Sequence, residues 1–194
     1  MQEQEKTVVR GRDIYDWIQA LVGSVLAVVL LFTFVIRLVG VDGHSMLDTL
    51  QDNDRLLVVN SLLYHNYQYG DIVILRKDGA FDNEPIVKRV IAVGGQTVDI
   101  DFNAGTVYVD GAALEEPYAR EATWLAEGVE FPLTVPAGCL FLMGDNRNDS
   151  EDSRSADLGP VDSRCVIGKA VFLALPGKTA DLNAREWNRV GFLR

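Results

Sequence analysis

Residues 85–100, PIVKRVIAVGGQTVDI, are interpreted as two β-strands joined by a turn. Apolar and β-branched side chains dominate Pro85 to Val93, a composition and length typical of a strand. Gly94 and Gly95 then supply a turn signal before the strand-like run from Thr97 to Ile100. The stretch therefore predicts a β-sheet rather than a helical core.

Similar apolar runs, separated by turn residues, continue on both sides of this stretch. The further predicted strands are Arg55 to Val59, Asp71 to Leu75, Thr106 to Val109, Cys139 to Met143 and Cys165 to Leu173. A Gly-containing loop predicts that Thr106 to Val109 forms a hairpin with Thr97 to Ile100. Residues 112–136 lack clean periodicity and are interpreted as an excursion, and a helix is one option for residues 179–194. The predicted body is mainly β.

A long apolar segment precedes this body. Residues 17–36, WIQALVGSVLAVVLLFTFVI, contain no charge and are long enough as a helix to cross a hydrocarbon core of roughly 30 Å. The run is too long for a cleaved signal peptide and lacks an Ala-x-Ala exit, so we expect an uncleaved transmembrane helix rather than a buried core helix. Lys6, Arg10 and Arg12 precede it and only Arg37 follows closely, which favours a cytoplasmic N-terminus.

Length and charge limit the domain plan and the partners. We expect a short cytoplasmic N-terminus (1–16), one transmembrane anchor (17–37) and one extracytoplasmic domain (38–194). The net charge of -10 arises entirely after Arg37, where 14 basic residues face 24 acidic ones. An acidic body without a dense Lys/Arg run repels phosphate backbones, so nucleic acid is not a predicted partner.

The turn directly after the anchor carries a candidate nucleophile. Ser45 lies in the small and polar sequence VDGHSMLDTL, residues 41–50. A serine hydroxyl needs a base to become nucleophilic, and histidine is the usual one. His44 is adjacent to Ser45, which generally directs the two side chains apart, and His65 lies in a polar stretch that reads as exposed. A Ser-His-Asp triad is therefore the weaker of two hypotheses.

Lysine can serve as the base instead when burial lowers its pKa from a reference value of about 10.4. Lys88 shares a strand face with Ile86, Val90 and Ala92, because side chains alternate across a strand. That setting would remove water from the amine. The alternative is a lysine that reaches solvent from a strand edge. Lys169 lies in a similar apolar run, so periodicity does not choose between the two lysines.

Residues 143–154, MGDNRNDSEDSR, form the densest polar stretch. A calcium loop begun at Asp145 would have Arg147 at its third position and Ser150 where the sharp turn needs glycine, so no metal site is predicted. A solvated turn is one interpretation. The mixture of both charge signs with small hydroxyls also suits a buried hydrogen-bonded network beside a lysine.

The two cysteines, Cys139 and Cys165, both follow the anchor, where a disulfide would be permitted. Both lie in apolar strand-like runs, so two buried thiols are favoured over a bridge. Neither cysteine has a metal-type spacing to His44 or His65.

Three segments together resemble the conserved boxes of bacterial type I signal peptidases, the Ser/Lys dyad family S26, and their order matches too. The segments are Gly43-His44-Ser45-Met46, Val87-Lys88-Arg89-Val90-Ile91 and Gly144-Asp145-Asn146-Arg147-x-x-Ser150-x-Asp152-Ser153-Arg154. Flanking strands resemble the family as well, so that the likeness runs from about Trp17 to Phe172. The third segment is the most specific of the three.

The resemblance implies that Ser45 attacks the scissile carbonyl and that Lys88 takes its proton and later returns it to the leaving amine. It also implies a family fold, a β-rich catalytic domain after one transmembrane helix. The Ser45 backbone N–H would hold the oxyanion. Some members add a hydroxyl two residues upstream, but here Gly43 lacks a side-chain donor.

Supporting roles follow from the same resemblance. Ser150 and the backbone at Gly144 would position the lysine, and Asp152 would form a salt bridge with Arg154. The likeness also resolves the choice between the two lysines in favour of Lys88.

The implied activity is that of a membrane-bound serine endopeptidase that removes signal peptides from exported preproteins, without a cofactor or metal, at the outer surface of the cytoplasmic membrane. The expected partners are the preprotein, bound as an extra strand with small P1 and P3 residues, the lipid bilayer and the export machinery. Two departures stand out: Asp48 replaces the usual proline, and Gly94-Gly95-Gln96 replaces Pro-Gly-Asp. They keep two alternatives open, a related peptidase for pilin or other surface-protein precursors and a non-catalytic membrane-tethered assembly factor.

Overall fold

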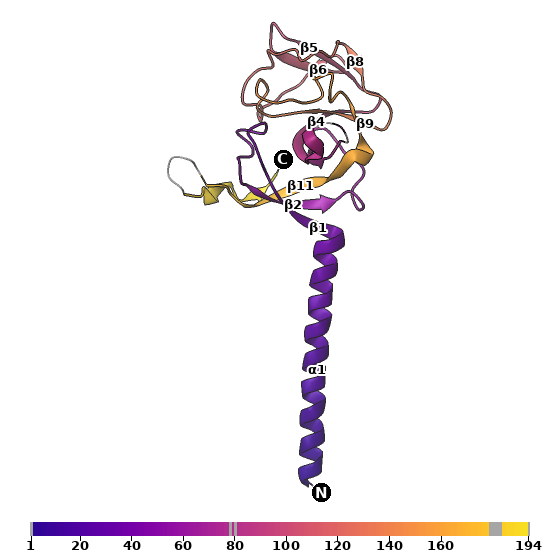
Figure 1. Cartoon of the computed structure of the whole chain (residues 1–194), viewed down its shortest axis with the longest axis vertical. Coiled ribbons are helices and arrows are strands. Elements are labelled where there is room, and N and C mark those ends of the chain that lie inside the picture. Colours follow the sequence, from indigo (N-terminus) through magenta and orange to yellow (C-terminus); the bar gives the residue numbers. More distant parts are fainter. Residues whose placement is uncertain (1, 78, 80, 179–183, 194) are drawn as a thin grey trace. The chain divides into compact units, whose positions relative to one another are not determined.

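The computed structural model describes residues 2–77, 79, 81–178 and 184–193, and the chain divides into two compact units, Met1–Ile36 and Arg37–Arg194. The first unit is helical: α1 (Gln2–Leu30) is followed by a π-helical turn, η1 (Leu31–Val35). Figure 1 draws it as one continuous coil. Strand β1 (Ile36–Gly40) begins directly after it, so the last two residues of the predicted anchor are extended rather than helical.

The stretch Asp13–Val35 is long and apolar enough to cross a membrane, and none of its apolar window is buried within the protein. A run of 23 residues at 1.5 Å per residue covers the roughly 30 Å of a hydrocarbon core. The apolar side chains that would be costly to expose to water are therefore compatible with lipid. The assignment of residues 1–16 and 17–37 to cytoplasm and membrane stays a prediction.

The second unit is built on two antiparallel sheets. The larger has eight strands in the order β1-β2-β11-β3-β4-β9-β10, with β12 paired to β11. Its strands after β1 are β2 (Arg55–Asn60), β3 (Ile72–Leu75), β4 (Ile86–Val93), β9 (Cys139–Met143), β10 (Val161–Asp162), β11 (Val166–Leu175) and β12 (Gly191–Phe192). All the strands predicted for this sheet are present.

The smaller sheet has the order β7-β6-β5-β8. Its strands are β5 (Thr97–Asp101), β6 (Thr106–Val109), β7 (Ala112–Ala113) and β8 (Leu133–Thr134). Val98 pairs with Val109 and Asp101 with Thr106, which confirms the predicted hairpin. In Figure 1, β5, β6 and β8 lie together at one end of the body, next to β4 and β9. The predicted mainly β fold with an N-terminal helix is confirmed.

Strand β4 is central to the packing of the body. It pairs with β3 on one side and β9 on the other, and every residue from 87 to 92 is buried. Val87 packs in the hydrophobic cluster of β2 and β11, Val90 in the cluster around β3 and β9, and Ile91 in the cluster of the small sheet. A side chain on β4 is therefore placed by three parts of the core at once.

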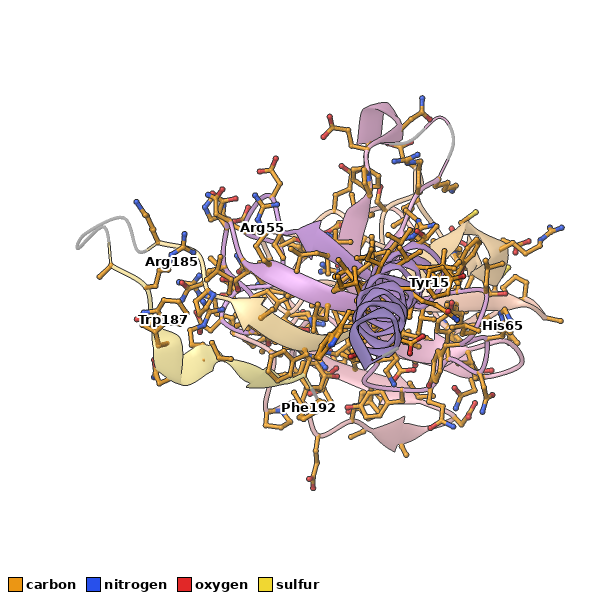
Figure 2. The ribbon with its side chains drawn as sticks, turned by 90° about the horizontal axis from the view of Figure 1, so that it is seen from below. Tyr15, Arg55, His65, Arg185, Trp187 and Phe192 are labelled. Carbon is orange, nitrogen blue, oxygen red and sulfur yellow. The ribbon has the colours of Figure 1, made fainter. Side chains whose placement is uncertain are left out.

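The C-terminal segment is not a long helix in its described part. It forms a single 3₁₀ turn, η4 (Trp187–Arg189), and then β12, while residues 179–183 and 194 lie outside the described residues. Phe192 packs edge-on against Phe172 of β11. Figure 2 shows Arg185, Trp187 and Phe192 along the outer rim of the body.

Candidate active site

Ser45 lies in a tight turn that the core holds from below. Met46, within the turn, and Leu50, at its end, are almost fully buried in the cluster of β2 and β11. Leu47 N–H donates to His44 O at 3.2 Å, and Leu50 N–H donates to Met46 O at 2.8 Å. These contacts anchor the apolar side of the turn and leave Ser45 half-buried on the other.

Lys88 projects from β4 directly toward this serine. Its Nζ lies 2.8 Å from Ser45 Oγ, within hydrogen-bond distance, although 43 residues separate the two in sequence. The side chain is only 3% exposed, and its β3 partner across the ladder is the fully buried Val73. Alternation along β4 predicts this apolar setting for the amine, and the structure places it there.

Burial lowers the pKa of Lys88 to about 8, because the charged ammonium loses its hydration. The carboxylates of Asp152, Glu127 and Glu151 act in the opposite direction and raise the pKa, while Arg154 lowers it. Desolvation is the largest effect. A substantial fraction of the amine is therefore neutral near physiological pH and able to accept a proton.

The polar segment after β9 forms a buried network centred on Asp152. Its Oδ2 accepts from Gly144 N–H at 2.9 Å and from Ser150 Oγ at 3.1 Å. Arg154 binds the same carboxylate through Nε and Nη2, each at 2.8 Å. All four residues are buried. The resemblance implied that Ser150 positions the lysine. In the structure its hydroxyl donates to Asp152, and Asp152 forms the salt bridge with Arg154.

Glycine at position 144 brings this network against the nucleophile turn. A Cβ at Gly144 would lie 2.5 Å from Ser45 O and even closer to the Ser150 side chain, so no larger residue fits without displacing backbone. Asn146 adds two further links, because its N–H donates to Ser45 O at 3.0 Å and its amide donates to His44 O at 3.1 Å. The polar segment therefore fixes the backbone of Ser45.

The resemblance implies an oxyanion site at the backbone of Ser45. Gly43 adopts φ +95°, a left-handed conformation that favours glycine, and its N–H donates to Asp52 Oδ1 at 3.1 Å. Among the described residues, the N–H of Ser45 has no hydrogen-bond partner. It is therefore available to an anion that develops beside Oγ. Asp48, in place of the usual proline, is exposed.

The other candidate bases are not placed for this role. His44 and His65 are both exposed, and the recorded side-chain contact of His65 is with Leu62 O. Lys169 lies 2.6 Å from Asp71 and 3.3 Å from the Tyr64 hydroxyl. Burial lowers the pKa of Lys169, but these two partners outweigh it and raise the pKa above its ordinary value. Lys169 therefore remains a cation.

Sequence reasoning did not single out two buried ion pairs that support the site. Arg89, the neighbour of Lys88, binds Asp145 at 2.7 Å, and Arg147 binds Glu116 at 2.6 Å. Arg89 also stacks over Tyr118, 4.0 Å from the ring centre. The alternation of charged residues in 143–154 indicates that ion pairs form there. It does not identify their partners, which come from distant parts of the chain.

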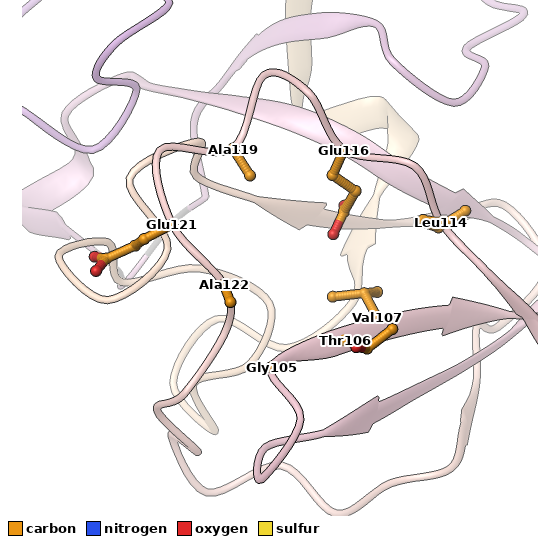
Figure 3. Close-up of a pocket in the computed structure, with 8 residues that line it drawn as sticks. All are labelled: Gly105, Thr106, Val107, Leu114, Glu116, Ala119, Glu121 and Ala122. Atoms are coloured by element: carbon orange, nitrogen blue, oxygen red, sulfur yellow. The ribbon is translucent and has the colours of Figure 1, made fainter.

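The excursion between β7 and β8 packs against β6 and forms a cavity of about 280 Å³. Figure 3 shows its lining, in which Glu116 and Glu121 are the charged side chains. Neither Ser45 nor Lys88 lines this cavity, and Glu116 is already bound to Arg147. The cavity is therefore separate from the dyad.

Cys139 and Cys165 are each half-buried and form no disulfide with each other. Neither thiol is as fully buried as expected, and the preference for two thiols over a bridge stays a prediction.

A β-rich body that holds a buried lysine amine against a serine hydroxyl is typical of serine hydrolases that use lysine as the base. The family described as "Signal peptidase, peptidase S26" matches residues 14–175. A signal peptidase I of Bacillus licheniformis is 36% identical over 181 residues, which cover 89% of this chain and 95% of that protein. The chain therefore belongs to the S26 signal peptidase family, a membrane-associated family, and the resemblance is confirmed.

Two further proteins show the range of similarity. A probable signal peptidase I-1 of Synechocystis is 37% identical over 179 residues, which cover 88% of this chain and 83% of that protein. A crystal structure of a signal peptidase I from Enterococcus faecalis is 30% identical, covers 54% of this chain and 96% of that chain, and has a TM-score of 0.44.

Proposed function

We propose that this protein is a membrane-bound signal peptidase that removes N-terminal signal peptides from exported preproteins through a Ser45–Lys88 dyad. Family membership supports the reaction class and the substrate class. The observation that carries the residue assignment is the 2.8 Å separation between Lys88 Nζ and Ser45 Oγ, with Lys88 only 3% exposed. No cofactor is needed, because the nucleophile and the base both belong to the chain.

In the acylation step, Ser45 Oγ attacks the scissile carbonyl while neutral Lys88 takes the hydroxyl proton. The new ammonium then protonates the leaving amine, and an acyl-enzyme on Ser45 remains. A water molecule, deprotonated by the again neutral Lys88, hydrolyses this ester and releases the signal peptide. The Ser45 N–H stabilises the oxyanion in both steps, with no side-chain help from position 43.

The supporting residues hold this geometry. Gly144 and Ser150 donate to Asp152, whose other partner is Arg154, and the absence of a side chain on Gly144 allows the network to reach the Ser45 backbone. The network thereby orients the serine while its charges act on the lysine amine.

The location follows from the anchor. We assign residues 1–16 to the cytoplasm, 17–37 to a single membrane span and 38–194 to the extracytoplasmic side. Ser45 follows Ile36 by nine residues, at most roughly 30 Å of extended chain, so the nucleophile is tethered close to the membrane. A preprotein that emerges from the export machinery presents its cleavage site near the same surface, and the lipid bilayer and that machinery are the expected partners.

The test is cleavage of a preprotein with an Ala-x-Ala site by the full-length protein in detergent. Ser45→Ala and Lys88→Ala are each expected to abolish cleavage, since they remove the nucleophile and the base. Lys169→Met, which removes a lysine from a similar apolar strand but not from the dyad, is expected to retain cleavage. Full residual activity in either dyad variant would rule the mechanism out.

A further inference from the structure

The excursion between β7 and β8 is fastened to the polar catalytic segment along much of its length. The recorded bonds are Arg120 N–H to Asp145 O (2.9 Å), Trp124 N–H to Asn148 Oδ1 (2.9 Å), Val129 N–H to Arg154 O (3.1 Å) and Ala156 N–H to Glu127 O (3.3 Å). Gly128 also forms a β-bridge with Ser155. The excursion is thus a fixed wall of the site, and its side chains are held at defined positions beside residues 145–156.

Glu127 is the acidic residue of this wall that reaches the network. Its Oε1 lies 3.2 Å from Arg154 Nη2, and its side chain is 20% exposed. Its Oε2 is buried and has no hydrogen-bond partner among the described residues. Arg154 is fully buried, so it is shared between Asp152 on its own segment and Glu127 on the excursion. Burying a carboxylate oxygen without a hydrogen-bond partner costs free energy, and such an oxygen in a native fold normally has a functional role.

The electrostatic surroundings of Lys88 indicate that role. Four charged groups act on the amine: Asp152, Glu127 and Glu151 favour its charged form, and Arg154 disfavours it. Asp152 is committed to Gly144, Ser150 and Arg154 by hydrogen bonds, whereas Glu127 keeps one oxygen uncommitted. Glu151 is exposed to solvent, so Glu127 is the partly buried carboxylate of this group that has an uncommitted oxygen when the amine gains a proton.

We propose that Glu127 is a positioning residue for the Ser45–Lys88 dyad, which holds Arg154 together with Asp152 and stabilises the ammonium that Lys88 becomes when it takes the Ser45 proton. The inference rests on the proposed function, because it assigns Glu127 a part in the same proton transfer. No new bond or reactant is involved: the proton moves from Ser45 Oγ to Lys88 Nζ and on to the leaving amine, and Glu127 acts through its charge.

The sign of the effect follows from these contacts. An ionised Glu127 favours the protonated lysine, so its removal lowers the pKa of Lys88 and increases the neutral fraction at low pH. Its removal also leaves the positive charge of Arg154 less neutralised, and that charge lowers the pKa of Lys88 as well. The same change makes Lys88 a weaker base and leaves its ammonium less stabilised. Burial raises the pKa of Glu127 itself. The charge of Arg154 and a hydrogen bond from the Asp152 backbone lower this pKa, while the charges of Asp152 and Glu151 raise it, so the effect on Lys88 is largest well above the pKa of Glu127.

The experiment measures kcat/KM for an Ala-x-Ala precursor across pH values on both sides of 8, using full-length protein in detergent. Glu127→Gln is compared with Glu121→Gln, which removes an exposed carboxylate from the same excursion without touching Arg154. On the acid limb, below about pH 8, we expect Glu127→Gln to be about two- to fivefold more active than wild type. On the plateau at higher pH it should be about two- to tenfold less active than wild type. The Glu121→Gln profile should follow wild type.

A second readout follows Lys88 without catalysis. The labelling of its amine by acetic anhydride, measured by mass spectrometry against pH, should have a lower midpoint in Glu127→Gln than in wild type. Glu127→Asp keeps the charge on a shorter side chain, so its labelling midpoint should lie between those of wild type and Glu127→Gln. This variant serves as the test if Glu127→Gln does not fold. If the midpoint is lowered in Glu127→Gln but neither wild type nor any variant cleaves the precursor, the role of Glu127 at Lys88 is supported and only the proposed function is overturned. A uniform loss of activity with an unshifted midpoint overturns the inference.

Discussion

Gly144→Ala tests whether the polar segment positions the nucleophile. A Cβ at this position would lie 2.5 Å from Ser45 O, whereas ordinary contacts begin at 3.4 Å. The Ser45 backbone or the whole segment must therefore move by about 0.9 Å. The same Cβ would also clash with the Ser150 side chain, so two parts of the site would have to move. A misplacement of about 1 Å in a catalytic group typically reduces the rate about 100-fold, and we expect a loss of kcat/KM of at least that order.

The assay compares kcat/KM for preprotein cleavage and thermal unfolding in detergent. Gly191→Ala is the matched control, because a Cβ there meets nothing within 4 Å and β12 lies away from the dyad. The control should behave as wild type in both measurements. Gly144→Ala should also lose roughly 1–3 kcal/mol of stability through overpacking. If Gly144→Ala cleaves within threefold of wild type, the close contact between Gly144 and the Ser45 backbone does not position the serine.

Two further predictions follow from charges. Because neutral Lys88 is the base and burial lowers its pKa to about 8, kcat/KM should rise about tenfold per pH unit up to about pH 8 and then level off. An activity profile that still rises at pH 10 would contradict the assignment. The unfolded chain binds more protons at Lys88 between about pH 8 and the ordinary lysine pKa of 10.5, so this residue makes stability rise with pH in that window. Arg189→Ala should destabilise the fold by roughly 2–4 kcal/mol in denaturant titration, because it leaves the fully buried Asp54, now 2.7 Å from Arg189, without its cation. Arg164→Ala, which breaks an exposed pair with Asp162, should change stability little, and equal effects would refute the argument.

The strands that sequence reasoning found are those whose apolar pattern is long enough to be recognised. Strand β4 was predicted from its apolar run, whereas the choice of Lys88 over Lys169 came from the family resemblance. Strands β7, β8, β10 and β12 have two residues each, so no periodicity exists to detect. Strand β1 was hidden because its first two residues, Ile36 and Arg37, fall within the predicted anchor and only three residues follow them.

The residues of the candidate site also fall into those that the sequence predicts and those that it does not. Ser45 and Lys88 emerged from a local turn, an alternating strand and a family resemblance, and the structure brings their side chains together. Glu127 and Glu116 could not be predicted, because they lie in residues 112–136, where no pattern indicates which side chain turns inward. Their partners Arg154 and Arg147 come from another part of the sequence, and such long-range ion pairs depend on the fold itself.

The central claim is that burial lowers the pKa of one lysine, Lys88, to about 8, so that a substantial fraction of it is neutral near physiological pH while it contacts the nucleophile. An NMR titration of isotope-labelled lysine in detergent-solubilised protein, with Lys88→Met used to assign the signal, measures this directly. We predict that Lys88 titrates near pH 8, well below Lys169, whose pKa is raised by Asp71. A Lys88 midpoint at its ordinary value of 10.5 or above would contradict the account.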